Sequence, residues 1–438
     1  MEETLKKTVD KFIELSKNKE ILIISHHDTD GITSAAIIAR ALERQDLSFS
    51  IKILKQLEEP TIDKLPEDKI LVFLDLGSSH IESLSKLNTE TFIIDHHEVD
   101  IKKIPENIFI INPHLIDKEE ISASGLTYLF VKNLNDNNKD LASLGVIGLV
   151  GDFLSQNISK HANELIKDSE VKIKRGLLIY PATRPINKSL EYSTSMFIPG
   201  VTGNPNGVFE ILQEAGITKG NKPYKSIIEL TQEENSKLIT GILLRRMKKD
   251  NEDIIGNIYL VKFFNKLEDA RELSALINAC GRLDSPETAI GFCLGNKDCR
   301  KRAEEIYASY KQHLIAGLNS IEKLQKIQGK GYLIVNAQDK IKDTIIGTVA
   351  SILSNSSVYD EGTILIAMAY SKDKIKVSAR LTGRKGRNLK EILNIVTNKI
   401  GGECGGHSMA AGAIIEKEKG AEFIEAIRKT LDIETVKV

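Results

Sequence analysis

The sequence predicts an α/β protein: a mainly parallel N-terminal sheet with helices on both faces, a connecting helix, and a smaller C-terminal α/β domain. Two observations carry this prediction. In the first half of the chain, short runs that are apolar at every position alternate with helical patterns. Near residue 328 a second alternation of strand and helix patterns begins.

The strands predicted in the first half are short and rich in β-branched residues. They cover 21–25, 49–54, 70–75, 91–95 and 108–111. Two helical segments, 124–135 and 140–156, follow the last strand. Because strands that are apolar on both faces must be covered on both sides, we expect a parallel sheet between two layers of helices.

A strong helix is predicted over 231–250, where Thr231 is the N-cap and Glu234 completes a capping box. A strand near 254–263 and long helices follow. We therefore expect a first domain over 1–230, a connecting segment over 231–327 and a second domain over 328–438.

Strand and helix patterns also alternate in the last predicted domain. A strand over 331–337 and a helix over 344–354 precede two further strands, 363–371 and 374–381, which we expect to pair as a hairpin.

The composition is that of a soluble globular protein. Hydrophobic residues make up 41% of the 438 residues and charged residues 28%, which excludes a disordered chain. The net charge of -1 does not by itself indicate a nucleic-acid binder, so such a role would need local basic patches. No apolar run approaches the roughly 18 residues of a membrane span, and four cysteines are few, so we expect a cytoplasmic protein without a membrane partner.

Acidic residues and histidines gather where the predicted strands end. These residues are His26, Asp28 and Asp30 after the first strand, Asp75 after the third, Asp95, His96 and His97 after the fourth, and Asp152 in the helix 140–156. The carboxyl ends of parallel strands meet at one crevice, so we expect these side chains to converge. If 26–30 is extended, its alternate residues His26, Asp28 and Asp30 point the same way. A single aspartate after a strand is often only a turn residue.

So many carboxylates in one place repel one another unless cations neutralise them. Carboxylates mixed with imidazoles suit Mn²⁺, with Mg²⁺ as the alternative, and the absence of cysteine argues against a thiolate zinc site. The predicted chemistry is phosphoester hydrolysis by two metal ions that activate a water molecule for in-line attack on phosphorus. Asp75, central among the strands, is the expected bridge between the ions.

This ordered set of residues resembles the four motifs of the DHH phosphoesterase superfamily. The resemblance implies that His26, Asp28 and Asp75 hold one ion. It also implies a second group of ligands, made of Asp30, Asp75, His96 and Asp152. In this pattern His97 orients the substrate or a ligand and Asp95 supports it, which with Asp75 completes the implied catalytic set.

The C-terminal part resembles the substrate domain of the DHHA1 subfamily. Gly405, Gly406 and His407 begin a segment similar to its GGH-x-x-A-A-G motif, and Arg380 precedes it at a suitable distance. The resemblance implies that glycine amides and Arg380 hold a phosphate. It also implies that His407 approaches the substrate across an active-site cleft between the two domains.

Residues 276–283 resemble the LNAAGRL segment of RecJ-type nucleases, with Asn278 and Arg282 at the polar positions. Read without the family, the segment is an ordinary helix that ends at Gly281. Arg184 lies in a stretch that resembles archaeal RecJ-like proteins. Together these matches make the chain similar to archaeal RecJ-like exonucleases of the GINS-associated type, and Asn278, Arg282 and Arg184 candidate substrate contacts.

We therefore expect a manganese-dependent exonuclease that degrades single-stranded DNA or RNA to nucleoside 5′-monophosphates in DNA repair or replication. Two alternatives stay open: a phosphodiesterase for short oligonucleotides or cyclic dinucleotides, and a replisome scaffold that binds GINS-like proteins. A second copy of the chain is also open as a partner. Tryptophan is absent and aromatic residues are 5% of the chain, so base-stacking surfaces should be sparse.

Overall fold

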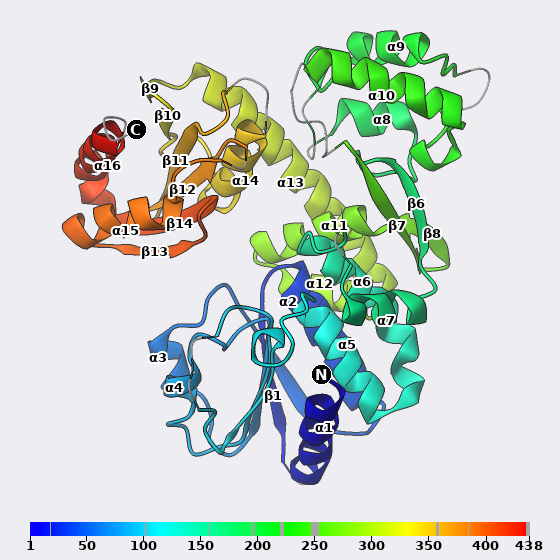
Figure 1. Cartoon of the computed structure of the whole chain (residues 1–438), viewed down its shortest axis with the longest axis vertical. Helices are drawn as coiled ribbons and strands as arrows, with labels where there is room; N and C mark the ends of the chain where they lie inside the picture. The colour runs from blue at the N-terminus through cyan, green and yellow to red at the C-terminus, as the bar shows by residue number, and fades with distance from the viewer. Residues whose placement is uncertain are drawn as a thin grey trace. The chain divides into compact units, whose positions relative to one another are not determined.

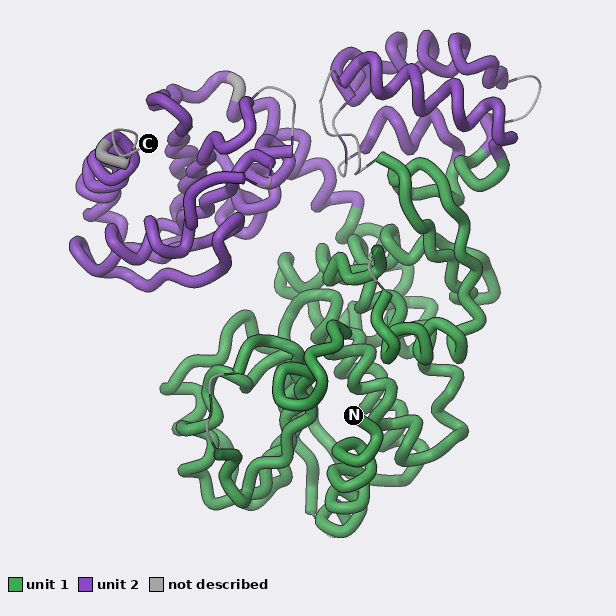
Figure 2. Tube along the Cα trace, viewed as in Figure 1, with its two compact units in different colours: residues 1–184, 226–229, 253–307 green, residues 185–225, 230–252, 308–438 purple. Residues whose placement is uncertain are grey.

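The computed structural model describes the chain in two compact units (Figure 2). Unit 1 comprises residues 1–184, 226–229 and 253–307, and unit 2 comprises 185–225, 230–252 and 308–438. The described residues are all except 18, 100, 102, 157, 194, 195, 197, 220–222, 247–253, 356–358, 384 and 435–438. The predicted domain boundaries at 230 and 327 stay predictions.

Unit 1 is built on a five-stranded parallel sheet, as the apolar runs predict. Its strands are β1 (Ile21–His26), β2 (Phe49–Leu54), β3 (Ile70–Leu74), β4 (Thr91–Ile94) and β5 (Ile108–Ile111), in the order β2-β1-β3-β4-β5. All neighbouring pairs are parallel, so every strand ends at the same edge. The central strand β3 is buried at all five positions, which explains why its sequence is uniformly apolar.

Helices cover this sheet on both faces. One layer contains α1 (Glu2–Ser16), α2 (Thr29–Glu43) and α5 (Ala123–Leu134), seen together beside the sheet in Figure 1. In this layer the ring of Phe12 meets those of Phe92 and Phe130 edge-on, at 5.1 and 5.4 Å between centroids. The opposite face is covered by two single turns, α3 (Glu59–Ile62) and α4 (Ile81–Leu84), whose Ile62 and Leu84 pack in one cluster with Phe73.

The rest of unit 1 consists of helices around a small antiparallel sheet. The helices are α6 (Ala142–Gly151), α7 (Lys160–Asp168), α11 (Ala270–Arg282), α12 (Pro286–Cys293) and the first part of α13 (Lys297–Lys323). The sheet has the order β6-β7-β8, formed by β6 (Lys172–Leu177), β7 (Ile255–Phe263) and β8 (Lys266–Asp269). The 3₁₀ helices of this unit are Pro113–Leu115, Asp136–Leu141 and Ile227–Glu229.

The predicted helix 140–156 is wrong at both ends. Residues up to Leu141 form a 3₁₀ helix, and α6 stops at Gly151, so Asp152 is the C-cap and not a helical residue. The chain leaves the helix because Phe153 has a positive φ of 59°. A side chain at Gly151 would lie 2.9 Å from Cβ of Thr29, so α6 approaches the start of α2 closely at this end.

Helix α11 packs against the connection between β1 and α2. The Thr29 N–H donates to Oδ1 of Asn278 at 3.0 Å, and the Thr29 hydroxyl donates to the carbonyl of Ser274 at 2.8 Å. A Cβ atom at Gly281 would lie only 1.8 Å from the carbonyl oxygen of His27. The segment 276–283 therefore forms the end of helix α11 and its C-cap. It contacts the β1–α2 connection although the two are about 250 residues apart in the sequence.

One part of unit 2 is helical. It comprises α8 (Ile186–Glu191), α9 (Pro205–Glu214) and α10 (Gln232–Arg246). The predicted capping box is confirmed: the Thr231 N–H donates to Oε2 of Glu234 at 2.8 Å, and the Glu234 N–H donates to the Thr231 hydroxyl at 3.1 Å. Residues 247–250 of the predicted helix lie outside the described residues.

The other part of unit 2 is a six-stranded mixed sheet of order β13-β14-β12-β11-β10-β9. Its elements are β9 (Lys326–Gly329), β10 (Tyr332–Asn336), α14 (Asp343–Ser354), β11 (Ile364–Ser371), β12 (Lys374–Leu381), α15 (Leu389–Ile400), β13 (Glu403–Gly406), β14 (Ala410–Glu416), the 3₁₀ helix Lys417–Lys419 and α16 (Gly420–Glu434). The predicted hairpin is confirmed, with Ile364 opposite Leu381. Met368, Ile392 and Phe423 share one core that joins the sheet to α15 and α16. Among the described residues of both units, no helix combines the length and the apolar character that a membrane span requires.

We expect Gly281→Ala to destabilise the protein by about 1–3 kcal/mol, because the new methyl group overlaps the His27 carbonyl oxygen and α11 must move away. Urea unfolding measures this loss. Gly241→Ala in α10 is the matched control: its nearest neighbour would be the Ile211 side chain at 3.2 Å, and alanine favours a helix by about 1 kcal/mol. Equal stability of the two variants would contradict the packing described for α11.

Candidate metal centre

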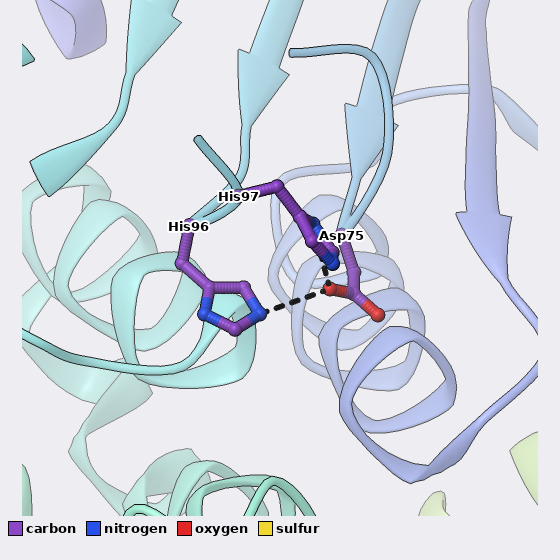
Figure 3. Close-up of side chains that lie close together, drawn as sticks. All are labelled: Asp75, His96 and His97. Atoms are coloured by element: carbon purple, nitrogen blue, oxygen red, sulfur yellow. Dashed lines mark ion pairs between the residues drawn. The ribbon is translucent and has the colours of Figure 1, made fainter. Parts of the chain in front are cut away.

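The polar side chains of the predicted site come together at the carboxyl end of the five-stranded sheet. Asp75 follows the central strand β3, and His96 and His97 follow its neighbour β4; Figure 3 shows both histidines beside the Asp75 carboxylate. Asp75 has a positive φ of 58°, a conformation that aspartate tolerates better than most residues. Its N–H is held by the carbonyl of Ile94, which fixes the turn that carries the carboxylate.

Two groups of donor atoms share Asp75. In the first, Nδ1 of His26 lies 2.9 Å from Oδ2 of Asp28 and 3.2 Å from Oδ2 of Asp75. In the second, Nε2 of His96 lies 3.4 Å from Oδ1 of Asp75, the opposite oxygen of that carboxylate. The same His96 nitrogen lies 3.0 Å from Oδ2 of Asp152 and 3.9 Å from Oδ2 of Asp30.

These spacings fit a pair of divalent cations. Neighbouring ligands of an octahedral ion with bonds near 2.1 Å are about 3 Å apart. The distances above are 2.9 and 3.2 Å in the first group and 3.0 to 3.9 Å in the second. Among the described residues, three sets have donor atoms within 4.8 Å of one another: His26, Asp28 and Asp75; Asp30, His96 and Asp152; and Asp75, His96 and His97. Oxygen and imidazole donors without sulfur suit Mn²⁺ or Mg²⁺, and the two oxygens of Asp75 face different groups.

Asp30 is fixed by the beginning of helix α5. The N–H groups of Ala123 and Ser124 donate to its two carboxylate oxygens at 2.6 and 3.0 Å. A helix N-terminus carries partial positive charge, so this arrangement stabilises a buried carboxylate that no lysine or arginine reaches among the described ion pairs. A side chain at Gly148 would lie 2.6 Å from Oδ1 of Asp30, so α6 must also be free of side chains there.

Asp28 and Asp30 reach the site by a route that differs from the expected one. Asp28 is the N-cap of α2 and accepts the Gly31 N–H at 3.1 Å, so an extended backbone stops there. Asp30 lies in the first helical turn, which makes the predicted extended alternation wrong for this residue. A Cβ at Gly31 would lie 2.4 Å from the His26 carbonyl oxygen, so only glycine allows the chain to turn so tightly into the helix.

Asp95 and His97 form a supporting pair. The Asp95 carboxylate accepts the N–H groups of Ser78 at 3.0 Å and His96 at 2.8 Å, and it lies 2.7 Å from Nδ1 of His97. These hydrogen bonds hold the pKa of Asp95 below its usual value despite burial, so it stays ionised. His97 is half exposed and can reach a ligand with the rest of its ring.

The carboxylates and the histidines shift one another's protonation. Burial lowers the pKa of His26, but Asp28 and Asp75 outweigh it and raise that pKa to about 11. Burial acts likewise on His96, and Asp152 and Asp75 raise its pKa to about 12. Burial raises the pKa of Asp75 to about 6, and burial with repulsion from Asp152 and Asp75 raises that of Asp30 well above its usual value. The cluster therefore retains protons that a bound cation would displace.

Two of the three predicted substrate contacts of unit 1, Asn278 and Arg282, lie in α11, and the third, Arg184, contacts this helix. The side-chain oxygen of Asn278 accepts the N–H of Thr29, which lies between the predicted ligands Asp28 and Asp30. Arg282 lies near enough to contribute to the lowered pKa of His27, a shift that burial dominates. Nη2 of Arg184 lies 2.6 Å from Oε1 of the buried Glu272, so this arginine is anchored on α11. Their contact with substrate stays a prediction.

The remaining predicted contacts lie in unit 2. Arg380 is on β12, where its Nε donates to the Ser351 hydroxyl at 2.8 Å. The glycine motif begins on strand β13 and continues into the turn that follows it, with Gly405, Gly406 and His407 exposed. Arg380 pairs with Ala410 and Gly406 with Ala411, so the arginine and the glycines lie at the same end of three adjacent strands.

Several residues that build the site are not ligands and were missed by the sequence analysis. Thr29, Ser78 and Ser124 orient the ligand loops through their backbone N–H groups or hydroxyls. Asn112 donates to the His97 carbonyl at 2.9 Å and so supports the β4 loop. One sequence signal was available: Ser122 is a typical N-cap before an apolar run, and it marks the helix start that holds Asp30.

Comparison with known protein families agrees with this geometry. Residues 20–149 match the DHH family N-terminal domain, 180–254 the DHH-CID domain and 329–432 the DHHA1 domain. An uncharacterized protein of Methanocaldococcus jannaschii, MJ0831, is 32% identical over 425 residues, covering 93% of this chain and 92% of that protein. The chain belongs to the DHH family. The resemblance inferred from the motifs is thereby confirmed.

This DHH-family chain also resembles more distant proteins. A Bacillus subtilis prophage protein, YorK, provisionally named a single-strand DNA-specific exonuclease, is 29% identical over 208 residues, which are 43% of this chain and 34% of YorK. Exonuclease RecJ bound to manganese has a TM-score of 0.61 at 16% identity and covers 97% of this chain and 93% of that one. CDC45 from Entamoeba histolytica has a TM-score of 0.65 at 13% identity, with 97% and 99% covered. The fold is therefore RecJ-like, as expected.

We expect Mn²⁺ binding to release more than one proton at pH 7–8, because His26 and His96 have raised pKa values and must lose their protons to act as ligands. Affinity should accordingly rise with pH. Calorimetry in two buffers of different ionisation heat measures the released protons. His96→Gln should release fewer, whereas His161→Gln, which alters a histidine paired with Asp117 instead, should match the wild type. An affinity that does not change between pH 6 and 9 would contradict this assignment.

Proposed function

We propose that this chain is a metal-dependent exonuclease that hydrolyses single-stranded DNA or RNA and releases nucleoside 5′-monophosphates. The observation that supports this most directly is the carboxylate of Asp75, whose two oxygens face two separate ligand groups. Two adjacent cations are the usual arrangement for phosphodiester hydrolysis. The provisional name of YorK and the RecJ-like fold favour a nuclease over other phosphoesterases.

His26, Asp28 and Asp75 would hold one cation, and Asp30, Asp75, His96 and Asp152 would hold the other. When bound, the cations supply neutralisation of the phosphate charge and activation of a water molecule for attack on phosphorus. The chain's own contribution is position: α5, α11 and the capping of α2 fix the carboxylates before substrate arrives.

His97 is proposed to orient the scissile phosphate. A hydrogen bond with Asp95 raises the pKa of His97, which favours the protonated ring. With Nδ1 engaged by Asp95, the other ring nitrogen is free to donate to a phosphate oxygen. Asp95 is thus a positioning residue that acts through His97.

Unit 2 is proposed to hold the nucleotide strand. The guanidinium of Arg380 supplies positive charge for a phosphate, and it is held in place because its Nε and Nη1 donate to Ser351, Ala379 and Ala411. The exposed Gly405 and Gly406 have no side chain that would keep an anion from the backbone. His407 is exposed on the same turn and is proposed as a further contact. Asn278, Arg282 and Arg184 would contact substrate from unit 1.

End-labelled strands test the proposed function. The protein is incubated with Mn²⁺ and DNA or RNA strands of about 5 and about 30 nucleotides. Ladders of mononucleotide steps on the long strands support the exonuclease. Cleavage of the short strands alone would show an oligonucleotide phosphodiesterase instead, with cyclic dinucleotides tested next. If the folded protein binds Mn²⁺ but cleaves neither, a scaffold role beside GINS-like proteins takes its place.

We expect His96→Ala to lower the hydrolysis rate by at least about 100-fold, since losing a ligand costs more than losing an outer hydrogen-bond partner. His96 is partly exposed, so its removal spares the core. Asp30→Ala is less clean, because it also leaves the N–H groups of Ala123 and Ser124 without acceptors. Hydrolysis at the wild-type rate in His96→Ala would exclude the site. His80→Ala, which alters a partly exposed histidine outside the ligand groups, is the control.

We expect Arg380→Lys to raise KM for the 30-nucleotide strand by about 10-fold while Mn²⁺ affinity stays unchanged, because lysine keeps the charge but cannot make all the hydrogen bonds to Ser351, Ala379 and Ala411 that fix the guanidinium. Steady-state kinetics and calorimetry measure the two quantities. Lys374→Ala removes an exposed charge from the other end of the same strand and should leave KM unchanged. An unaltered KM in Arg380→Lys would remove β12 from the proposed substrate path.

A further inference from the structure

Phe153 directly follows the proposed metal ligand Asp152 and is 89% exposed, more than any other large apolar side chain among the described residues. Its backbone also has a positive φ of 59°. A bulky residue rarely adopts this left-handed conformation, and such outliers concentrate at functional sites. Both the exposure of the ring and the conformation of the backbone oppose stability.

The turn that carries Phe153 is fixed on both sides. The N–H groups of Phe153 and Leu154 donate to the last carbonyls of α6, those of Val150 and Leu149, at 3.3 and 3.2 Å. On the other side, the buried Tyr259 hydroxyl donates to the Ser155 carbonyl at 2.6 Å. The exposed ring is therefore presented by a held backbone and not by a loose loop.

A second contact with strand β7 strengthens this hold. The Asn257 N–H donates to Oε1 of Gln156 at 3.2 Å, and the Gln156 amide donates back to the Asn257 carbonyl at 3.4 Å. A Cβ at Gly256 would lie 2.5 Å from Oε1 of Gln156, so the strand runs close beneath the turn. Gly256 and the buried Tyr259 therefore both help to hold the segment that exposes Phe153.

We propose that Phe153 is a stacking platform for a nucleobase of the substrate, next to the metal centre. This inference rests on the proposed function and adds to it a direct contact with the base. The Cα atoms of Phe153 and Asp152 are one peptide unit, about 3.8 Å, apart. Oδ2 of Asp152 lies 3.0 Å from Nε2 of His96, inside the second ligand group. A phosphate at that group carries its base one sugar away, which is within reach of the neighbouring residue's ring.

The chemistry of the contact is sequence-tolerant. Every base has a flat π-face, so one rigid aromatic ring can serve each nucleotide that enters in turn. A hydrogen-bonding side chain would instead favour particular bases, whereas an exonuclease must accept each nucleotide of the strand. In a chain with few aromatic residues, a single ring beside the ligands supplies what a broad stacking surface would provide elsewhere.

The absence of tryptophan from the sequence makes this inference directly measurable. Phe153→Trp introduces the only tryptophan, whose fluorescence is titrated with a 5-nucleotide strand, about one binding site long, in Ca²⁺ to slow hydrolysis. The strand should quench it, and a strand of equal length without bases should quench it far less. Phe209→Trp, an exposed ring on α9, is the matched control and should not respond.

Kinetics give the second readout. Phe153→Ala should raise KM for DNA strands by about 5- to 100-fold with little change in kcat, and Phe153→Tyr should restore it, whereas Phe153→Leu should not. The inference is wrong if the wild type degrades strands, Phe153→Ala has the wild-type KM, and the fluorescence of Phe153→Trp is the same with and without bases in the strand. The proposed function would stand in that case. Fluorescence that instead responds only to protein concentration would assign the ring to contact between copies and likewise overturn it. If the wild type cleaves no strand, the proposed function itself fails.

Discussion

The organisation of unit 1 depends on one electrostatic constraint, the burial of several carboxylates around Asp75. Asp30 and Asp75 are almost fully buried, and among the described residues their ion pairs are with histidines alone. Burial disfavours such charge unless protons or cations neutralise it. The surrounding elements orient the carboxylates but do not neutralise them, and bound divalent ions would do so.

The supports of this centre are mostly backbone groups. The start of α5 holds Asp30, the capping of α2 holds Asp28, and three N–H groups hold Asp95. Backbone donors cannot change rotamer, so they fix the orientation of the carboxylates that they contact. The close approach of the backbone to the site also explains Gly31 and Gly148. A Cβ at these positions would collide with the ligand loop or with the Asp30 carboxylate.

The parts of this structure that the sequence predicts are those set by local pattern. Mostly apolar runs predicted all five strands of the first sheet, and the residues after them predicted the cluster of carboxylates and imidazoles, because parallel strands end at one edge. The role of these residues as metal ligands stays a prediction. The end of α6 was misplaced because Phe153 has no local signal for a left-handed backbone. The partnership of Thr29 with Asn278 joins positions 249 residues apart, and no periodicity in either segment encodes it. Similarly, no local pattern in Glu403–Gly406 predicts a strand, yet this segment pairs with β14.

The packing of α11 against the β1–α2 connection has a consequence for biosynthesis. The first 31 residues contain half of the ligand set, but Asn278 and Gly281 leave the ribosome only after more than half of the polypeptide has been made. Until then the Thr29 amide lacks its acceptor and the nascent chain exposes an unfinished cluster of carboxylates. A product truncated before α11 would therefore carry His26, Asp28 and Asp30 without the contact that holds Thr29 between them.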